Sequence, residues 1–515
     1  MKCSLGYGVR FVLFLFAGWT AFACSELPDV PVMSGSMMSA DAAIDVGGAA
    51  LLDTGVSRDA QPYIDASLLD AMILADGAAD MAGHIVDGTA DMAGEFVDQG
   101  VTDSNPPDVA FEVVYPAQGI HSPFDRTVLV SLHSLIGAAD NLRDDVFMKV
   151  GASSTVSRRS FYCFDGGGID LGDYEYLRET LDYFQDGMAG NTSPFSRETL
   201  AARVGRGAGW AIDGEPSPLQ AEIDAIQPRF AFVHYGTNDM GFGATYGAAL
   251  RVFYDNMADL LDVLEGQGIV PIVLGISARL DNPSADLWVP TFNTVIRGLA
   301  QMRQRPFIDL HHALLSLDEQ GISSDGLHLN SFRDGACQLT DDGLEYGYNV
   351  RNLITLQSLD RLREALSDEL LEVPGARLFG RGTHDEPYQI ESFPFVHHAD
   401  TTLSAERRFD RYGCDDADES GPEIVYTLEL ATPSRVRGFV FDRGDVDIDI
   451  HLLGANGGAD NCIDRDHHAI DVELEPGIYR VVLDTFVSAS GRERAGEFLV
   501  ALTACALDAP GCRWD

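Results

Sequence analysis

The chain has 515 residues, too many for a single hydrophobic core, so two or three domains are expected. Its 80 acidic side chains outnumber 35 Lys and Arg, which gives a formal charge of -45. Such a charge disfavours nucleic acid and anionic lipid headgroups as partners, because their phosphates would be repelled. Apolar residues make up 45% of the chain, as in ordinary globular proteins.

Residues 1–23 predict an export signal. A basic start precedes an apolar stretch from Phe11 to Ala23, and Ala21-Phe22-Ala23 fits a small-x-small cleavage pattern. Cys24 follows directly, so the site also resembles a bacterial lipoprotein signal, with Phe22 atypical. We expect a mature protein lipid-anchored through Cys24 to the outer membrane or cell envelope, with ordinary secretion as the alternative. No later segment is apolar enough to span a bilayer.

Residues 24–108 predict an acidic linker. Positions 25–108 hold sixteen acidic residues and a single base, Arg58, and an eleven-residue repeat fills 77–87 and 88–98. Few apolar side chains are available to offset the entropy of ordering such a segment. We interpret it as a spacer. A calcium-binding repeat is the alternative, but its glycine spacing matches no known loop.

Residues 109–370 predict an α/β domain. Residues 230–235 (FAFVHY) indicate a buried strand, and apolar residues recur at helical spacing from Leu250 to Leu264. Further strands are expected at 269–276 and 306–310. This alternation predicts a parallel sheet covered by helices on both faces. Catalytic groups in such sheets gather at the carboxyl ends of the strands.

Three short motifs carry the predicted chemistry. Gly151-Ala152-Ser153 follows an apolar run, which is the layout that lifts a serine out of a sheet. Asp325 and His328 are three residues apart, so on a tight loop the carboxylate can hold one ring nitrogen while the other faces Ser153. The oxyanion formed by attack needs preorganised donors. The expected donors are the Ser153 amide, a glycine amide from a second loop, and the side chain of Asn238 in Gly236-Thr237-Asn238-Asp239.

In this order the motifs resemble blocks I, III and V of the SGNH (GDSL-like) hydrolases, over about residues 140–365. The resemblance implies a three-layer α/β/α flavodoxin-like fold and ester hydrolysis without metal or other cofactor. It implies Ser153 as the nucleophile, His328 as the base and Asp325 as the residue that orients the base. Asn238 would lie in the oxyanion hole.

Two positions leave the resemblance incomplete. The block II glycine of the family is placed at Gly205, although Gly207 and Gly209 are close enough to serve. The family usually has Asp where this chain has Ala152. That Asp is not part of the triad but helps to shape the nucleophile loop, so its loss leaves room for a weakened or inactive enzyme.

The cysteines predict disulfides. Six of the eight lie beyond Cys24, and an exported protein can form disulfides. No C-x-x-C pair is present, so no cysteine-based zinc site is expected. Cys163 lies ten residues after Ser153 and Cys337 nine after His328, which favours a 163–337 disulfide if the two loops meet. Two buried thiols are the alternative. Pairing of the others is left open: Cys414, Cys462, Cys505 and Cys512.

Residues 383–515 predict an antiparallel β-sandwich. After a Gly- and Pro-containing junction at 371–382 the pattern becomes alternating, in strands expected near 424–430, 446–452, 470–474, 478–484 and 497–504. Residues 445–452 and 474–484 resemble the bacterial pre-peptidase C-terminal (PPC-like) sandwich. Asp445, Asp447 and Asp449 share one face and could bind calcium, with a solvated sheet face as the alternative.

The sequence thus predicts an exported serine ester hydrolase that acts through an acyl-enzyme on a small-molecule or glycan ester. A short acyl group is expected, and O-acetylated carbohydrate is the first expectation. The alternative is a carbohydrate- or surface-binding protein that has kept the fold and lost turnover.

Overall fold

The computed structural model describes residues 111–367, 373–509 and 512. The predicted export signal, Cys24 and the acidic linker lie outside these residues. Among the described residues, no helix combines the length and the apolar character that crossing a membrane requires.

A four-stranded parallel sheet forms the centre of the first domain, in the order β2-β3-β4-β5. On the outer side of β2, Ala202 adds one parallel bridge to Gly151. Flavodoxin-like folds have the strand order 2-1-3-4-5. Here β2, β3, β4 and β5 take the places of strands 1, 3, 4 and 5, and the single bridge at Ala202 takes the place of strand 2. The strands are β2 (Arg143–Gly151), β3 (Pro228–His234), β4 (Val270–Leu274) and β5 (Phe307–Ile308).

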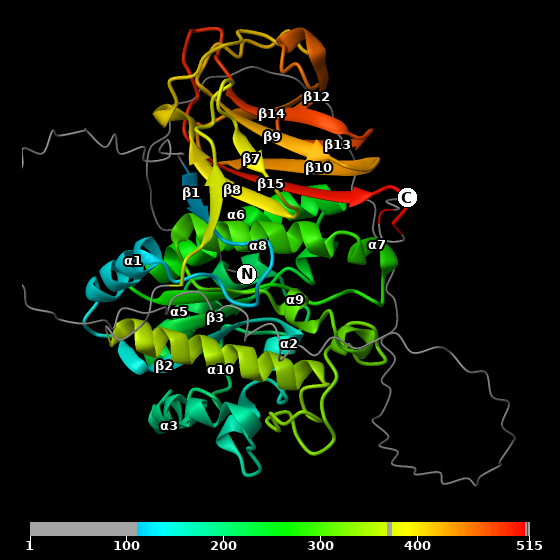
Figure 1. Ribbon diagram of the computed structural model, residues 1–515. Coiled ribbons are helices and arrows are strands. Elements are labelled where there is room, and N and C mark those ends of the chain that lie inside the picture. Colours follow the sequence, from blue (N-terminus) through cyan, green and yellow to red (C-terminus); the bar gives the residue numbers. More distant parts are fainter. Residues whose placement is uncertain (1–110, 368–372, 510–511, 513–515) are drawn as a thin grey trace, which may run out of the picture. The chain divides into compact units, whose positions relative to one another are not determined.

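Helices cover both faces of this sheet, as predicted. Figure 1 shows α6 and α8 on one side and α10 and α3 on the other. The helix expected between Leu250 and Leu264 is α6, whose apolar side is buried. The α-helices are α1 (Arg126–Gly137), α2 (Ser153–Val156), α3 (Arg178–Asp186), α4 (Ala208–Ile212), α5 (Pro218–Ile226), α6 (Tyr246–Glu265), α7 (Pro283–Asp286), α8 (Val289–Arg303), α9 (Leu310–Leu314) and α10 (Gly347–Leu366).

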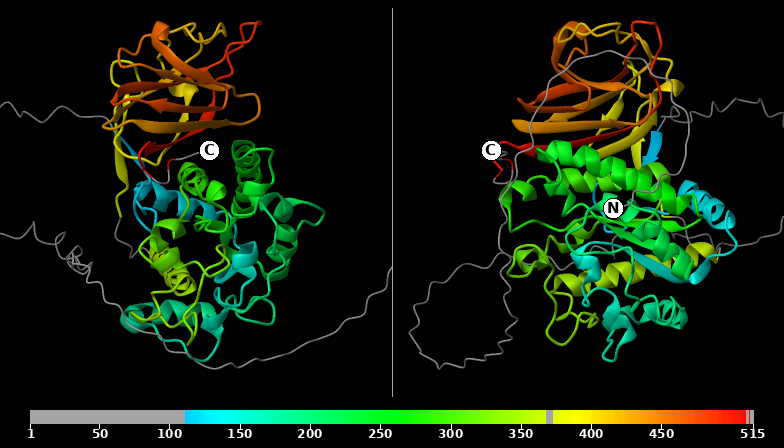
Figure 2. Two further views of the ribbon diagram at one scale, coloured as in Figure 1. Left: turned by 90° about the vertical axis from the view of Figure 1, so that its right-hand side faces the viewer. Right: turned by 180° about the vertical axis from the view of Figure 1, so that it is seen from behind.

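The second domain consists of two sheets, ordered β12-β11-β14-β9-β7 and β13-β10-β15-β8 (Figures 1 and 2). All pairs are antiparallel except β7 with β9. A separate ribbon pairs β1 (Phe111–Val114) with β6 (Ala376–Phe379), so part of the expected junction is a strand. The others are β7 (Tyr388–Ile390), β8 (Phe395–Asp400), β9 (Glu423–Leu430), β10 (Ser434–Asp442), β11 (Ile448–Leu453), β12 (Cys462–Asp466), β13 (Ala469–Leu474), β14 (Gly477–Thr485) and β15 (Glu497–Ala506).

Strand β10 was not predicted, because its residues do not alternate. Val436 and Val440 face the interior of the sandwich, whereas Phe439 and Phe441 join the hydrophobic core of the α/β domain. Both faces of the strand are therefore apolar. Close contact continues at Gly298 on α8, where a Cβ atom would come within 2.8 Å of Leu499. The sandwich thus shares a core with the α/β domain.

The turn at 475–477 does not form a β-hairpin. It joins β13 to β14, which belong to different sheets, so the two strands are not hydrogen-bonded neighbours. Strand β14 instead pairs with β11 and β9.

Candidate active site

Ser153 lies directly after the carboxyl end of β2, at the first position of the short helix α2. The chain turns tightly there. A Cβ atom on Gly151 would lie 2.8 Å from the carbonyl oxygen of His234, so only glycine fits. The turn brings the Ser153 hydroxyl to the edge of the sheet where the other candidate residues gather.

The structure brings the three predicted triad residues together. Oγ of Ser153 lies 2.9 Å from Nε2 of His328, and Nδ1 of His328 lies 2.7 Å from Oδ2 of Asp325. Both distances are hydrogen-bond distances. The sequence positions of the serine and the histidine differ by 175, so only the fold creates this contact.

Asp325 is held as an ionised acceptor. Its Oδ1 accepts bonds from the amides of His328 and Leu327, at 2.9 and 3.0 Å, and from the Ser323 hydroxyl at 2.8 Å. Slight burial acts to raise the pKa of Asp325, but these bonds and the His328 ring outweigh it and lower the pKa. The free Oδ2 then accepts from Nδ1, which leaves Nε2 of His328 as an acceptor facing Ser153.

Asn238 and Asp239 follow β3 and fix the second loop. The buried Asp239 carboxylate accepts bonds from the amides of Gly236 and Ala208, at 2.9 and 2.8 Å. Burial raises the pKa of Asp239 to about 6, against these bonds. Asn238 donates from Nδ2 to the carbonyl oxygen of Arg206 at 3.0 Å. This loop therefore binds the segment that carries the candidate block II glycines.

The two candidates for the block II glycine differ in their surroundings. Gly205 is exposed, and an added Cβ atom there would meet nothing within 4 Å, but its φ of +73° favours glycine. Gly207 is buried beside Asp239, where a Cβ atom would lie 2.8 Å from the Phe242 ring. The peptide between Arg206 and Gly207 is the one that Asn238 binds. Both positions therefore call for glycine, and the assignment of block II to Gly205 stays a prediction.

A small cavity of about 20 Å³ lies at the junction of the three loops. It has room for roughly one water-sized group. Neither Gly205 nor Gly207 is among its lining residues. The lining residues are Ala152, Ser153, Ser154, His234, Tyr235, Gly236, Thr237, Asn238, Leu327 and His328.

A fourth loop, after β4, connects two of the candidate loops. Arg279 donates from Nη1 to the carbonyl oxygen of Thr237 at 2.9 Å, and from Nε and Nη2 to the carboxylate of Asp281 at 2.8 and 3.0 Å. The amide of Asp281 donates to the carbonyl oxygen of Gly326 at 2.8 Å. Gly326 has φ +72°, and a Cβ atom there would lie 2.6 Å from the Asp281 nitrogen.

Sequence reasoning missed Arg279 and Asp281. Their signal was weak: two opposite charges at the carboxyl end of a predicted strand. In the structure they link the Asn238 loop to the Asp325–His328 loop, which fixes the distance between the oxyanion donors and the base.

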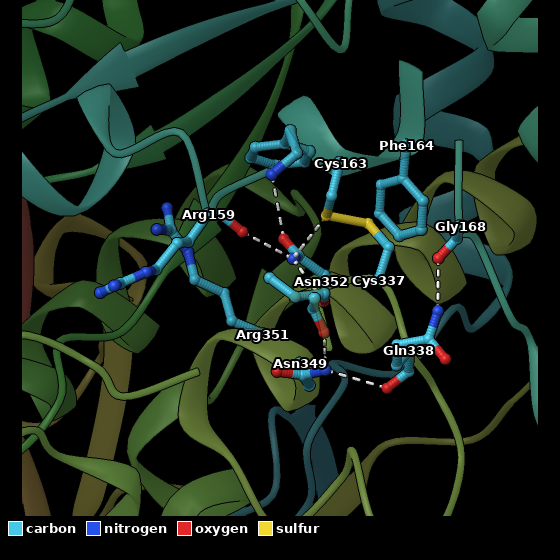
Figure 3. Close-up of a disulfide and its surroundings, with 12 residues drawn as sticks. Arg159, Cys163, Phe164, Gly168, Cys337, Gln338, Asn349, Arg351 and Asn352 are labelled. Atoms are coloured by element: carbon cyan, nitrogen blue, oxygen red, sulfur yellow. Dashed lines mark hydrogen bonds between the residues drawn. A yellow bond between two sulfur atoms is a disulfide. The ribbon is translucent and has the colours of Figure 1, made fainter. Parts of the chain in front are cut away.

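Buried polar side chains of α10 bind the segments that follow Ser153 and His328, as Figure 3 shows for Asn352. Asn352 accepts from the amide of Phe161 at 3.0 Å and donates to the carbonyl oxygens of Arg159 and Ala336, at 2.8 and 3.0 Å. Arg159 and Phe161 follow Ser153, whereas Ala336 follows His328. One asparagine therefore joins both loops.

Two further contacts place α10 against the site. The buried Arg351 donates from Nη1 to the carbonyl oxygen of Ser154 at 2.6 Å, next to the nucleophile. Asn330, two residues beyond His328, accepts from the amide of Gly347 at 2.7 Å through its side chain. The first residue of α10 is thereby fastened to the base loop.

The cysteines pair at three places in the described residues. Cys163 is bonded to Cys337, the pair that the sequence favours, between the loops that Asn352 joins (Figure 3). The pairing that the sequence left open is 414–462 and 505–512.

Of the three acids considered for calcium, Asp447 and Asp449 approach each other beside His467, and Asp445 is not part of that group. Asp445 is exposed and paired with Arg492, at 2.8 Å. Asp447 lies 3.5 Å from Arg494. Asp449 is fully buried, where it binds Arg465 and His467.

Comparison with known proteins agrees with the resemblance of the first domain. A family model for the GDSL-like lipase/acylhydrolase family matches residues 168–331, less than half of the chain. The match includes Asn238, Asp325 and His328 and begins after Ser153. It confirms the resemblance read from the motifs and indicates a hydrolase acting on esters. A search of curated proteins finds no match.

Among solved structures, the chain is similar to a GDSL-like lipase from Bacteroides thetaiotaomicron, at 13% identity, covering 45% of this chain and 98% of that one, with a TM-score of 0.28. A two-domain esterase active on acetylated mannans is 10% identical, and the match covers 75% of this chain and 98% of that one, with a TM-score of 0.29. The pre-peptidase C-terminal domain of a collagenase from Bacillus anthracis is 12% identical, and the match covers 22% of this chain and 92% of that one, with a TM-score of 0.16.

Removing the disulfide next to the site should lower stability. The double substitution Cys163→Ser and Cys337→Ser opens a cross-link between positions 174 apart, and we expect the free energy of unfolding to fall by about 2–5 kcal/mol. Denaturant unfolding followed by circular dichroism measures this. Replacing Cys505 and Cys512, only 7 apart, is the matched control and should cost less. An equal fall in the free energy of unfolding in the two double variants would contradict the larger stabilisation expected from the Cys163–Cys337 disulfide.

Proposed function

We propose that the protein is an exported serine ester hydrolase with Ser153, His328 and Asp325 as its catalytic residues. The single observation that carries the proposal is the continuous hydrogen-bonded chain from Ser153 through His328 to Asp325, beside the Asn238 loop. The family match at residues 168–331 supports the same reaction class.

Each group has a definite task in the proposed reaction. Nε2 of His328 takes the proton of Ser153 as Oγ bonds to the ester carbonyl carbon. The carbonyl oxygen becomes an oxyanion, for which the donors are the Ser153 amide, Nδ2 of Asn238 and the amide of a block II glycine, Gly205 or Gly207. The tetrahedral intermediate collapses, and the alcohol leaves with the proton from His328. Water then attacks the acyl-enzyme by the same steps and releases the acid.

The acyl group is short in this proposal. The cavity beside Ser153 has a volume of only about 20 Å³, enough for roughly a methyl-sized group. The other side of the site is open, because the side chains of His328 and Asp325 are 36% and 51% exposed. A bulky alcohol, such as a sugar in a glycan chain, can therefore reach Ser153. An O-acetylated carbohydrate meets both conditions.

Backbone contacts hold the nucleophile loop at Ala152, where the family usually has Asp. The amide of Val156 donates to the carbonyl oxygen of Ala152 at 3.0 Å, and Arg351 binds the carbonyl oxygen of Ser154. These contacts support turnover. A binding protein without turnover would have the same fold, and the labelling experiment below distinguishes the two.

Export belongs to the proposal. The basic and apolar start of the chain, the cleavage pattern before Cys24 and three disulfides in the described residues support it, because disulfides persist in oxidising compartments. The protein is then lipid-anchored at Cys24 or secreted.

Labelling with a fluorophosphonate tests the proposed chemistry. The full chain should react in a 1:1 ratio at Ser153, and Ser153→Ala should abolish both labelling and ester hydrolysis. Ser134→Ala, which removes an exposed hydroxyl on α1, should change neither. An unlabelled, folded wild-type protein would identify a binding protein rather than an enzyme.

A chain-length series tests the acyl group. Hydrolysis of p-nitrophenyl acetate should exceed that of the butyrate in kcat/KM by at least about tenfold and that of the octanoate by more, because two extra methylenes do not fit the cavity. Equal or rising values with chain length would contradict a short-acyl site while leaving the hydrolase assignment intact.

Arg279 should act as a positioning residue. Arg279→Met removes the link between the Asn238 and His328 loops, and we expect kcat to fall by roughly 10²-fold with little change in KM. Arg279→Lys should recover part of the loss, since one ammonium can still reach Thr237 or Asp281. Arg333→Met, on an exposed arginine, is the matched control. An effect confined to KM would contradict a positioning role.

A further inference from the structure

A group of charged side chains is buried on the face of β11 that points away from the sandwich interior. Ile448, Ile450 and Leu452 fill the interior, so Asp449 and His451 face the opposite way. On most sheets of this kind the outer face meets water. Here a segment at 405–421 covers it, with Tyr412 packed on Val425, Leu453 and Val482.

Glu419 enters this face from the covering segment. The side chains of Glu419, Asp449 and His451 are 1%, 0% and 0% exposed. One ligand atom from each lies within 4.8 Å of the other two. Nε2 of His451 is 4.0 Å from Oε1 of Glu419, too far for a hydrogen bond.

His451 has no partner for its polar atoms. Among the described residues, neither ring nitrogen makes a hydrogen bond, and Oε2 of Glu419 is also without one. The ring stacks on Tyr412, with centroids 3.8 Å apart, so its plane is fixed. A buried imidazole with no hydrogen bond costs free energy unless something at this place binds it.

The charge at this place is also unbalanced. Arg465 is the cation that contacts Glu419 and Asp449, and it also binds Asp415 through Nη1 at 2.6 Å. One guanidinium thus faces three carboxylates, of which Asp449 is also contacted by Nδ1 of His467 at 2.6 Å. Burial and the neighbouring Asp449 raise the pKa of Glu419, which is the response of an acid with too little positive charge nearby.

We propose that Glu419, Asp449 and His451 form a binding site for one divalent transition-metal ion, with Zn²⁺ as the best match. One imidazole and two carboxylates suit Zn²⁺, whereas Ca²⁺ and Mg²⁺ take oxygen ligands alone. The three ligands belong to the sandwich domain and Ser153 to the α/β domain, so the ion takes no part in ester hydrolysis. Its role is to fasten the covering segment, through Glu419, to β11.

The observed spacing permits this once Nη2 of Arg465 withdraws from Glu419 and Asp449, which it now contacts. A tetrahedral ion with bonds of about 2.1 Å keeps its ligand atoms about 3.4 Å apart, so Nε2 of His451 and Oε1 of Glu419 approach by roughly half an ångström. Arg465 stays paired with Asp415 when the ion takes its place beside Asp449. Water completes the coordination.

Titration calorimetry with Zn²⁺ on the EDTA-treated full chain tests the proposal. Wild type and His398→Gln, a control histidine on β8, should bind one Zn²⁺ with equal affinity. Binding should weaken by at least about tenfold in His451→Phe, which keeps the stacking on Tyr412, and in the isosteric Glu419→Gln. Undiminished binding in both variants, or loss on Asp447→Asn instead, would overturn the proposal. So would binding of Ca²⁺ in preference to Zn²⁺.

A measurement on the wild type alone keeps the test decisive if the variants do not fold. Zinc K-edge absorption should show one imidazole and oxygen neighbours. Sulfur neighbours would overturn the assignment in favour of Cys414 and Cys462, which also lie near His451. Absence of bound Zn²⁺ in the folded wild type would likewise overturn it. Circular dichroism of the same sample confirms folding, and fluorophosphonate labelling reports separately on the proposed hydrolase.

Discussion

The arrangement of the candidate active site depends on hydrogen bonds from inside a buried helix. Helix α10 carries Arg351 and Asn352 among apolar neighbours, where each polar atom needs a partner. The partners are backbone groups of the two loops that bear Ser153 and His328. An apolar residue at position 352 would leave two buried backbone groups unpaired, the Phe161 amide and the Ala336 carbonyl oxygen, at about 1–3 kcal/mol each. The position of the serine relative to the histidine is therefore set by the core beneath them.

The loops are also tied to one another above the sheet. Asp239 binds the Gly207 segment, and the Arg279–Asp281 pair reaches from the Asn238 loop to the Asp325–His328 loop. Glycines stand where these loops approach most closely, at 207 and 326, because a Cβ atom would collide there. Each loop is thus held by residues of another, and the site is a property of the whole carboxyl edge of the sheet.

Much of this could be predicted from the sequence, because the reactive residues sit in short local patterns. Ser153 follows a strand and a glycine, and Asp325 and His328 are three residues apart, so their neighbours reveal them. The choice between Gly205 and Gly207 could not be made from the sequence, because the close approach at Gly207 comes from Asp239, on another loop. Arg351 has no local pattern, since its partner is a distant backbone atom, and Arg279 gave only a weak one, its charge near that of Asp281. Strand β10 lacks alternation because both its faces are buried, and Glu419 gives no sign of facing His451.

The bond between Cys163 and Cys337 ties the assembly of this site to the redox state of its surroundings. In a reducing environment the chain lacks that cross-link, and its two reactive loops are joined there by hydrogen bonds, those of Asn352 among them. Oxidation adds a covalent connection between them. Under the proposed export, that connection forms only after the chain has left the reducing cytosol, so the site gains its last cross-link in the compartment where the proposed hydrolysis would take place.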